Sequence, residues 1–517
     1  MDRAQRTLDG LAVAIAAAAI VVLATGGGAL GPVSLTRPED FVVALALVVG
    51  IRALLTPYRI PAVRPSRVVV TGVLLYLLAM GTIVVTRHLA LRTHALDLGQ
   101  PVQVLWNIVH GHGPVLTLIP MFVISDRMSR WGDHFEPILY TLAPLAWLWP
   151  GAVSLLVAQT VILAAGALAV YGYARARLDA PLGALFALLY LVNPSLHGIN
   201  IRDVHPAAFA IPLVLAAALA FDRGRYVWSA IALGLTLACR EDAAVAVVGF
   251  GVWLAVARGR WIPAAATVAI AAVVLFAEVL YVIPHFRGAP YHHLYRYETL
   301  GSSLTEIAVT LVFRPWRWLA LVVEPAKIVY LMALLASLGF LPLGAPPVLA
   351  AALPALLQNL LSVDPKLYNY RAQYQSYVLP FLVLAAVEGF RRLRETRGAR
   401  PLVGRFHAVA LLAAAFVLSA VLTAATVNDL GVRKWRLGPP EQAAYRLMAR
   451  VPPDASVSAN ERLVPHLATR SDVWVFPRGV GASEYVLELV SFEKDIPAAL
   501  YVEIARDSHW MLWRRRH

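Results

Sequence analysis

Three groups of charged side chains interrupt or border long apolar runs, and their residue types could do chemistry. Arg240, Glu241 and Asp242 stand together in the middle of one such run. Because a charge inside an apolar segment costs about 2.5–3.5 kcal/mol on insertion scales, this triplet must be internally paired or face a water-filled cavity. In the second case, we expect Arg240 to bind an anionic group and a carboxylate to bind a metal ion or a substrate.

The second group lies in a short polar turn and contains Arg202, Asp203 and His205. An ordinary turn between two helices is the alternative interpretation. Together with Asp97, Asp203 and His205 offer two carboxylates and one imidazole, which could hold a divalent cation such as Mg²⁺ or Mn²⁺. The spacing of these residues matches no dedicated metal motif, so the cofactor stays open.

The third group is a polar interval of about fifty residues, 88–137, between two apolar segments. A connection this long is either functional or disordered, and residues 101–109 within it predict a short amphipathic helix at the membrane surface. Its best single candidate is Asp97, as a general base, with capping of that short helix as the alternative. His134, near the end of the interval, is a candidate for substrate binding.

A second long interval, 284–325, carries His292 and Arg296 among tyrosines. Arginine pairs with phosphates in forked geometry, and aromatic rings stack on sugars. An interfacial belt of aromatic residues is the alternative. A later outer loop contributes Arg371 to the set of expected substrate-binding residues.

The elements that must position these groups are membrane helices. Of the 517 residues, 59% are hydrophobic and 15% are charged, and repeated apolar runs indicate an all-α polytopic membrane protein. The net charge of +14 does not indicate a nucleic-acid partner, because many arginines lie in short loops, where they fix membrane orientation. The single cysteine, Cys239, excludes an intrachain disulfide and a cysteine metal cluster.

Hydropathy predicts about eleven to thirteen transmembrane helices. Arginines between the second and third spans, and again at residues 391–405, place those loops in the cytoplasm. The amino terminus is then cytoplasmic, and the intervals 88–137 and 284–325 lie outside. The expected spans are 11–30, 41–56, 67–87, 152–173, 182–200, 206–221, a hairpin over 228–257, 263–283, 326–343, 347–361, 377–390 and 407–427.

The predicted spans divide the chain into three parts. Residues 1–66 form an N-terminal transmembrane hairpin, residues 67–427 form the membrane core, and residues 428–517 form a small extracytoplasmic α/β domain. In the last part, residues 441–450 predict a helix, and 456–458, 473–476 and 485–490 predict strands. The protein is expected in the plasma membrane.

Several short motifs resemble the prokaryotic membrane family called domain of unknown function 2079. The resemblance extends over roughly residues 67 to 490, and it departs from the family pattern at His94, Ala95 and Ala207. The matching pieces are Leu96-Asp97-Leu98-Gly99 with Gln103 and Trp106, residues 134–140, Asn193-Pro194 with Asn200, Asp203, His205, Pro206 and Phe209, Arg240-Glu241-Asp242, residues 377–381, and Pro465-His466-Leu467 with Arg470.

That family is similar to the glycosyltransferase C (GT-C) superfamily. The resemblance implies a GT-C-like membrane core and an enzyme that takes a sugar from a polyprenyl-phosphate donor. It also implies that the acidic residue in the first outer loop, here Asp97, is the catalytic acid or base. Arg240, and with it Arg202, would then stabilise the departing lipid phosphate.

Two alternatives remain from other functional classes. A transporter or channel for an anionic solute would use the intramembrane Arg240-Glu241-Asp242 group, but the chain shows no inverted repeat. The other alternative is a non-catalytic assembly protein of the envelope. The expected partners are the lipid bilayer, a polyprenyl-phosphate-linked sugar, and a glycan, lipid or protein acceptor.

Overall fold

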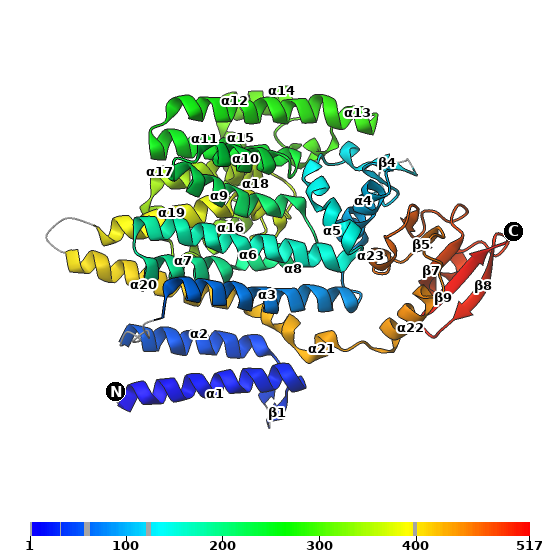
Figure 1. Cartoon of the computed structure of the whole chain (residues 1–517), viewed down its shortest axis with the longest axis horizontal. Helices are drawn as coiled ribbons and strands as arrows, with labels where there is room; N and C mark the ends of the chain where they lie inside the picture. The colour runs from blue at the N-terminus through cyan, green and yellow to red at the C-terminus, as the bar shows by residue number, and fades with distance from the viewer. Residues whose placement is uncertain (1–2, 31–32, 56–62, 120–125, 396–400, 517) are drawn as a thin grey trace.

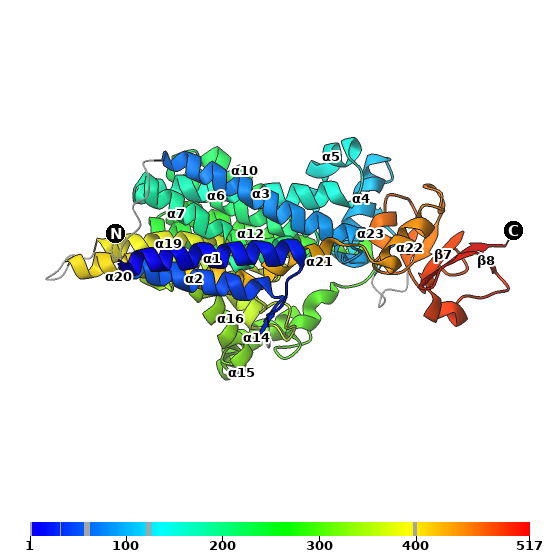
Figure 2. The same cartoon turned by 90° about the horizontal axis from the view of Figure 1, so that it is seen from below.

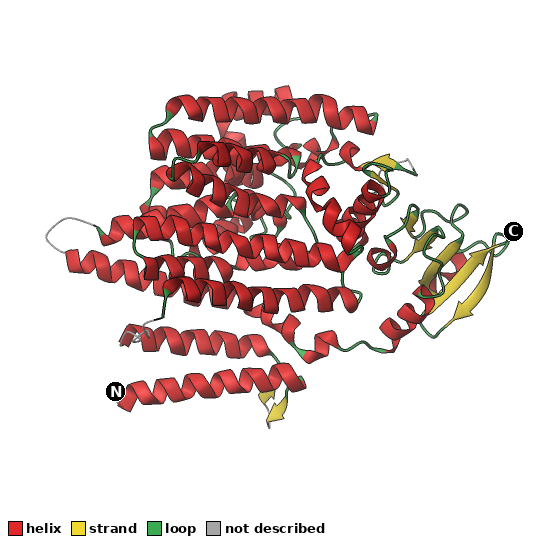
Figure 3. Cartoon of the chain, in the orientation of Figure 1, coloured by secondary structure: helices red, strands yellow, loops and turns green. Residues whose placement is uncertain are grey.

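A computed structural model describes residues 3–30, 33–55, 63–119, 126–395 and 401–516 of the chain. Long helices lie side by side with their axes roughly parallel, and a small domain with strands projects from one end of this bundle (Figures 1 and 3). The fold is that of an all-α polytopic membrane protein with a C-terminal sheet region. Part of the arginine run at 391–405 lies outside the described residues.

The centre of the bundle is helix α6 (Ala152–Arg177), which packs against α3 (Pro65–Leu89), α7 (Ala180–Leu191) and α9 (Ala210–Asp222). Small residues of α6, among them Gly166 and Ala167, face these neighbours and permit close approach of the helices. Helix α19 (Leu379–Arg394) also packs against α6, and α20 (Pro401–Val427) packs against α19.

Five described helices are long and apolar enough to cross a membrane, and seven if each of two bent helix pairs counts as one span. The predicted number was larger because several apolar segments form shorter helices. Proline and polar turns divide them, as between α7 and α8 (Pro194–Ile201), which meet at a bend of 42°. The four shorter apolar helical stretches are Pro137–Leu148, Pro206–Asp222, Tyr226–Leu237 and Pro346–Leu360.

The predicted hairpin over residues 228–257 consists of α10 (Tyr226–Leu237) and α11 (Ala244–Val252). The charged triplet forms its tip, with a short 3₁₀ turn at Glu241–Ala243. Helix α12 (Trp261–Ala277) follows and packs along α11. Charged residues in the middle of an apolar run therefore mark a turn and not a broken span.

Helix α4 (Gln100–Val109) corresponds to the amphipathic helix predicted at residues 101–109. Most of its residues are buried, including Gln103 and Asn107. The side chain of Gln103 connects α4 to the C-terminal domain, because its Nε2 donates to the carbonyl oxygen of Ser471 at 2.8 Å.

The C-terminal domain holds a five-stranded mixed sheet in the order β6-β5-β7-β9-β8. Sequence patterns predicted the first three strands and α22 (Pro439–Met448), and the structure adds a C-terminal antiparallel hairpin. The domain, which includes the short helix α23 (Val464–Leu467), sits beside α4 at one end of the bundle (Figure 2). The strands are β5 (Val457–Ala459), β6 (Val473–Val475), β7 (Tyr485–Leu489), β8 (Tyr501–Arg506) and β9 (Trp510–Arg515).

The N-terminal hairpin consists of α1 (Arg3–Thr25) and α2 (Pro38–Leu55), which pack on each other. Only α2 has an extensive contact with the core, along α20. Both helices lie at the edge of the bundle in Figure 1. The hairpin is therefore peripheral to the elements that carry the charged groups.

Candidate functional site

The charged groups that the sequence separates meet in one cavity of about 470 Å³, at the bundle end that carries the C-terminal domain. Eight of the eleven predicted site residues line it. They are Asp97, His134, Arg202, Asp203, His205, Arg240, His292 and Arg296.

Asp97 is exposed on the cavity wall, in a short π-helical turn at Ala95–Gly99 that leads into α4. The N-cap residue of α4 is Gly99, and no side chain caps this helix. A capping role for Asp97, the alternative interpretation, therefore has no support in the geometry. Asp97 lines the cavity.

Arg240 reaches the cavity from the hairpin tip, and its guanidinium is anchored from behind. Its Nε donates to Oδ1 of Asp242 at 2.6 Å, and its terminal nitrogen pairs with the other carboxylate oxygen. Asp242 also accepts from the hydroxyl of Tyr377 at 2.7 Å and from Gln358 at 3.2 Å. A forked pair of this kind fixes the orientation of the guanidinium.

Glu241 is almost fully buried behind the cavity wall and joins three elements. Its Oε1 lies 2.7 Å from Nδ1 of His134 and accepts from the hydroxyl of Tyr291 at 3.0 Å. The hairpin tip is thereby connected to both long polar intervals, 88–137 and 284–325. Glu241 and Asp242 thus position their neighbours and do not themselves line the cavity.

Arg296 and Arg240 both contact one aromatic ring. The guanidinium carbon of each is 5.3 Å from the ring centre of Tyr374, whose hydroxyl accepts from Arg296 at 3.0 Å. Cation–π contact of this kind offsets part of the cost of holding two positive groups near each other. Their combined field favours an anionic ligand in the cavity.

Asp203 has a left-handed backbone conformation, with φ of 61°, at the end of α8. Its Oδ2 accepts from the backbone N–H of His94 at 3.0 Å, and its carbonyl oxygen accepts from Gln159. Burial, together with the nearby charge of Asp97, raises the pKa of Asp203 to about 7. Asp203 thus connects the turn to the loop that carries Asp97.

Arg371 is not among the residues that line the cavity. Its guanidinium donates to the hydroxyl of Thr426 on α20 at 3.0 Å, and its backbone packs against Gly198 of α8. Arg371 therefore contacts two helices, α8 and α20.

Asp97, Asp203 and His205 share the cavity, but they are not a group with ligand-like spacing. Among the described residues, the one trio of His, Cys, Asp or Glu side chains whose ligand atoms all lie within 4.8 Å of one another is Asp133, His134 and His293. The histidines of that trio are stacked, with ring centres 4.4 Å apart.

Sequence reasoning missed several cavity residues that are charged and buried. Arg130 donates to Glu136 at 2.9 Å, to Asp133 at 3.1 Å and to Gln100 at 2.7 Å, which fixes the fold of the first outer loop. The signal was present in the density of acids and bases between residues 126 and 136. Arg87 and Lys366, which also line the cavity, carry no local motif.

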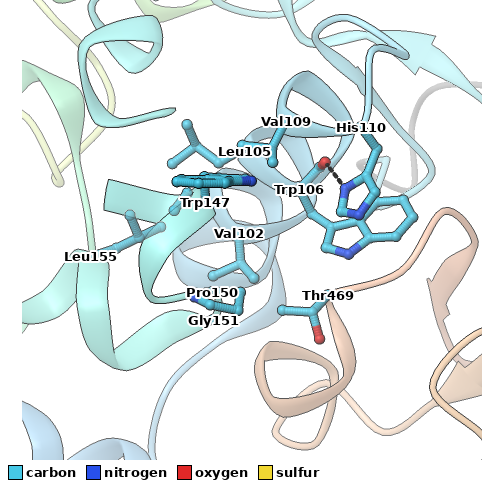
Figure 4. A pocket seen from close by; sticks show the side chains of 11 residues that line it. Val102, Leu105, Trp106, Val109, His110, Trp147, Pro150, Gly151, Leu155 and Thr469 are labelled. Carbon is cyan, nitrogen blue, oxygen red and sulfur yellow. Dashed lines mark hydrogen bonds between the residues drawn. The ribbon is translucent and has the colours of Figure 1, made fainter. Parts of the chain in front are cut away.

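A second cavity, of about 480 Å³, lies on the other side of α4. Figure 4 shows its mainly apolar lining by Val102, Leu105, Trp147 and Leu155, with Thr469 of the C-terminal domain at one edge. Pro101 lines the polar cavity, whereas the next residue, Val102, lines the apolar one. Helix α4 is therefore the wall between a charged and an apolar space.

The arrangement of helices is that of a GT-C-like membrane protein. Two structures of ArnT from Cupriavidus metallidurans, one in the apo state and one bound to undecaprenyl phosphate, resemble this chain with a TM-score of 0.52 and 14% sequence identity. Each comparison covers 86% of this chain and 98% of ArnT. At this identity, the similarity concerns the fold.

Residues 87–494 match the family of predicted membrane proteins called DUF2079. The chain belongs to this family. No curated protein matches the sequence. The multi-pass membrane location follows from the family and from the apolar helices.

Proposed function

We propose that this protein transfers a sugar from a polyprenyl-phosphate donor to an acceptor hydroxyl at the outer face of the membrane. One observation carries the proposal: an exposed carboxylate and six cationic side chains line a single cavity. The carboxylate is Asp97, and the cationic residues are Arg87, Arg130, Arg202, Arg240, Arg296 and Lys366.

The cationic side chains match the charge that develops on the donor. When the bond between the sugar carbon and the phosphate oxygen breaks, the lipid phosphate leaves with an additional negative charge. Fixed positive groups in a partly dehydrated cavity stabilise such a leaving group more strongly than water does. Arg240 suits this role best, because Asp242 orients its guanidinium without blocking the cavity side.

Asp97 is the general base of the proposed reaction. Its carboxylate takes the proton of the acceptor hydroxyl while the acceptor oxygen forms the new bond to the sugar carbon. A positioned base typically contributes about 10²–10⁴ in rate. The fold similarity to ArnT, one structure of which holds undecaprenyl phosphate, supports a polyprenyl-phosphate lipid as the donor carrier.

The Asp97→Asn variant of the full chain in detergent tests this role. Asp97 is exposed and caps no helix, so we expect normal folding and retained binding of undecaprenyl phosphate by native mass spectrometry. Release of undecaprenyl phosphate from a panel of synthetic undecaprenyl-phosphate sugars should fall by at least about a hundredfold. Glu298→Gln, an exposed acid in the other outer loop and outside the cavity lining, is the matched control.

If Asp97→Asn retained its activity, Asp97 would not be the general base of the reaction. A wild-type protein that binds undecaprenyl phosphate and turns over none of the sugars would favour a transport or assembly role instead. Loss of activity in Glu298→Gln as well would show that the outer loops respond non-specifically to charge removal.

A further inference from the structure

One corner of the polar cavity brings together a carboxylate and two imidazoles. Asp133 and His134 come from the end of the first outer loop, and His293 comes from a 3₁₀ turn of the second, His292–Tyr297. One ligand atom of each residue lies within 4.8 Å of those of the other two. Asp133 and His293 are 7% exposed, so this corner excludes most water.

His293 is poorly satisfied by the protein alone. Neither of its ring nitrogens has a hydrogen-bond partner among the described residues. Its nearest carboxylate contact, from Nε2 to Oδ1 of Asp133 at 3.4 Å, lacks hydrogen-bond geometry. A buried polar group without a partner destabilises the fold, so a cation that accepts a lone pair from His293 would offset this cost.

The two oxygens of Asp133 are divided between different partners. Oδ2 accepts from Arg130 at 3.1 Å, whereas Oδ1 faces the ring nitrogens of the second loop. The Arg130 contact therefore fixes the carboxylate and leaves one oxygen directed to the cluster. One oxygen of Asp133 therefore has a structural contact, and the other faces the position of the cation.

His134 has the outer contact that metal-binding histidines usually have. Its Nδ1 lies 2.7 Å from Oε1 of the buried Glu241, which also accepts from Tyr291. A carboxylate held on one imidazole nitrogen fixes the tautomer and leaves the other nitrogen, here Nε2, free to bind a metal. Glu241 is thus a positioning residue for His134.

We propose that Asp133, His134 and His293 bind one Zn²⁺ ion at the wall of the cavity. Two imidazole nitrogens and one carboxylate oxygen form the ligand set of zinc sites that keep a fourth position open, and imidazole donors favour zinc over Mg²⁺. The site is distinct from the cation set Asp97, Asp203 and His205. It does not depend on the proposed transferase activity, because its ligands are defined without a substrate.

Zinc binding requires one local movement. The lone pair of an imidazole nitrogen lies in the plane of its ring, and the rings of His134 and His293 are stacked with an interplanar angle of 5°. The ring of His293 must therefore turn toward His134 and Asp133. This rotation breaks no hydrogen bond of His293 among the described residues, and it changes the ring contacts of His293 with His134 and His292.

Metal content of the purified full chain tests the proposal. After chelator treatment and dialysis against ZnCl₂, we expect one Zn²⁺ per chain by elemental mass spectrometry and a higher thermal unfolding midpoint. His293→Ala should abolish stoichiometric binding, and Glu241→Gln should weaken it by about 10- to 100-fold. His110→Ala, an exposed histidine of the first outer loop, and Asp97→Asn should bind Zn²⁺ as the wild type does.

Several outcomes would overturn the site. Absence of stoichiometric Zn²⁺ in the wild type, or unchanged binding in His293→Ala, would show that the trio is a neutral packing cluster. Loss of metal in Asp97→Asn with full binding in His293→Ala would move the cation to the other acidic group. Because the readout is metal content, its failure is distinguishable from a failure of sugar transfer.

Discussion

Nδ1 of His134 lies 2.7 Å from Oε1 of Glu241, and this contact joins two segments that are 107 residues apart in the chain. His134 belongs to the first outer loop, and Glu241 belongs to the tip of the α10–α11 hairpin. The hairpin tip, whose neighbour Arg240 lines the cavity, is thereby fixed to the loop that carries Asp97. The relative position of Asp97 and the Arg240 guanidinium thus depends on a buried contact that neither sequence motif reveals alone.

We predict that Arg240→Ala lowers both stability and lipid-phosphate binding. Removal of one partner of a buried pair leaves the Asp242 carboxylate uncompensated, at a cost of roughly 3–5 kcal/mol. The measurement is denaturant or thermal unfolding in detergent, with undecaprenyl phosphate binding by native mass spectrometry. Arg202→Ala is the matched control, because Arg202 is exposed on the same cavity and should lose binding affinity without a comparable loss of stability.

Equal destabilisation by Arg240→Ala and Arg202→Ala would contradict this assignment. Arg240→Lys separates charge from geometry, since lysine retains the charge but not the forked contact. We expect it to recover part of the stability and little of the binding.

Asp203 should make stability depend on pH. Its folded pKa of about 7 lies above the ordinary value of 3.8, because burial and the Asp97 charge penalise the carboxylate. A group with a raised folded pKa contributes stability below its unfolded pKa, and this contribution is lost as pH rises through about 7. The loss is on the order of a few kcal/mol, from about 1.4 kcal/mol per pKa unit.

Thermal unfolding of wild type and Asp203→Asn between acidic and mildly alkaline pH measures this effect. Relative to the Asn variant, the wild type should lose stability as pH rises. Asp97→Asn should reduce the slope, because one source of the raised pKa is then absent. A wild type and an Asp203→Asn variant with parallel pH profiles would show that the Asp203 pKa is ordinary.

The membrane class and the presence of a site at one end of the bundle could be predicted from the sequence. Hydropathy alone identified the apolar segments, and the charges at Arg240, Glu241 and Asp242 identified a turn that must be paired or hydrated. The roles within the triplet could not be predicted. Only the fold shows that Arg240 faces the cavity while Glu241 and Asp242 face His134 and Tyr377.

Arg371 and α4 show where sequence patterns were insufficient. Both lie in polar intervals between apolar segments, but Arg371 contacts Thr426, and Gln103 of α4 donates to Ser471 of the C-terminal domain. Amphipathicity predicts that one face of a helix is buried and does not specify whether lipid or protein covers it. The hairpin β8–β9 was not predicted, although β9 begins with four consecutive buried residues.

Gln103 should be essential for docking of the C-terminal domain. Its fully buried amide donates to Ser471 at 2.8 Å and accepts from the backbone N–H of Thr117 at 3.0 Å. Gln103→Leu removes these bonds and leaves buried partners unsatisfied, each at about 1–3 kcal/mol. We expect faster release of the C-terminal domain in limited proteolysis, whereas Gln442→Ala, an exposed glutamine with a local contact, should match the wild type.

The last prediction concerns orientation, which the arginine ends of the helices support. Arg177 at the end of α6 donates to Glu388 of α19 at 2.5 Å, and Arg394 contacts Asp179 at 3.2 Å, so these cationic ends meet at one face of the bundle. By the positive-inside rule, that face is cytoplasmic. The polar cavity and the C-terminal domain lie at the opposite end and should therefore be outside (Figure 1).

Single cysteines introduced into a Cys239→Ser background test this orientation. Arg394→Cys and Arg462→Cys are matched, because both positions are exposed and lie at opposite ends of the protein. An impermeant maleimide should label Arg462→Cys in intact cells and Arg394→Cys only after lysis, and the Cys239→Ser background should stay unlabelled. The reverse pattern would place the cavity at the cytoplasmic face, and this would contradict the proposed role of Asp97 in transfer to an acceptor at the outer face.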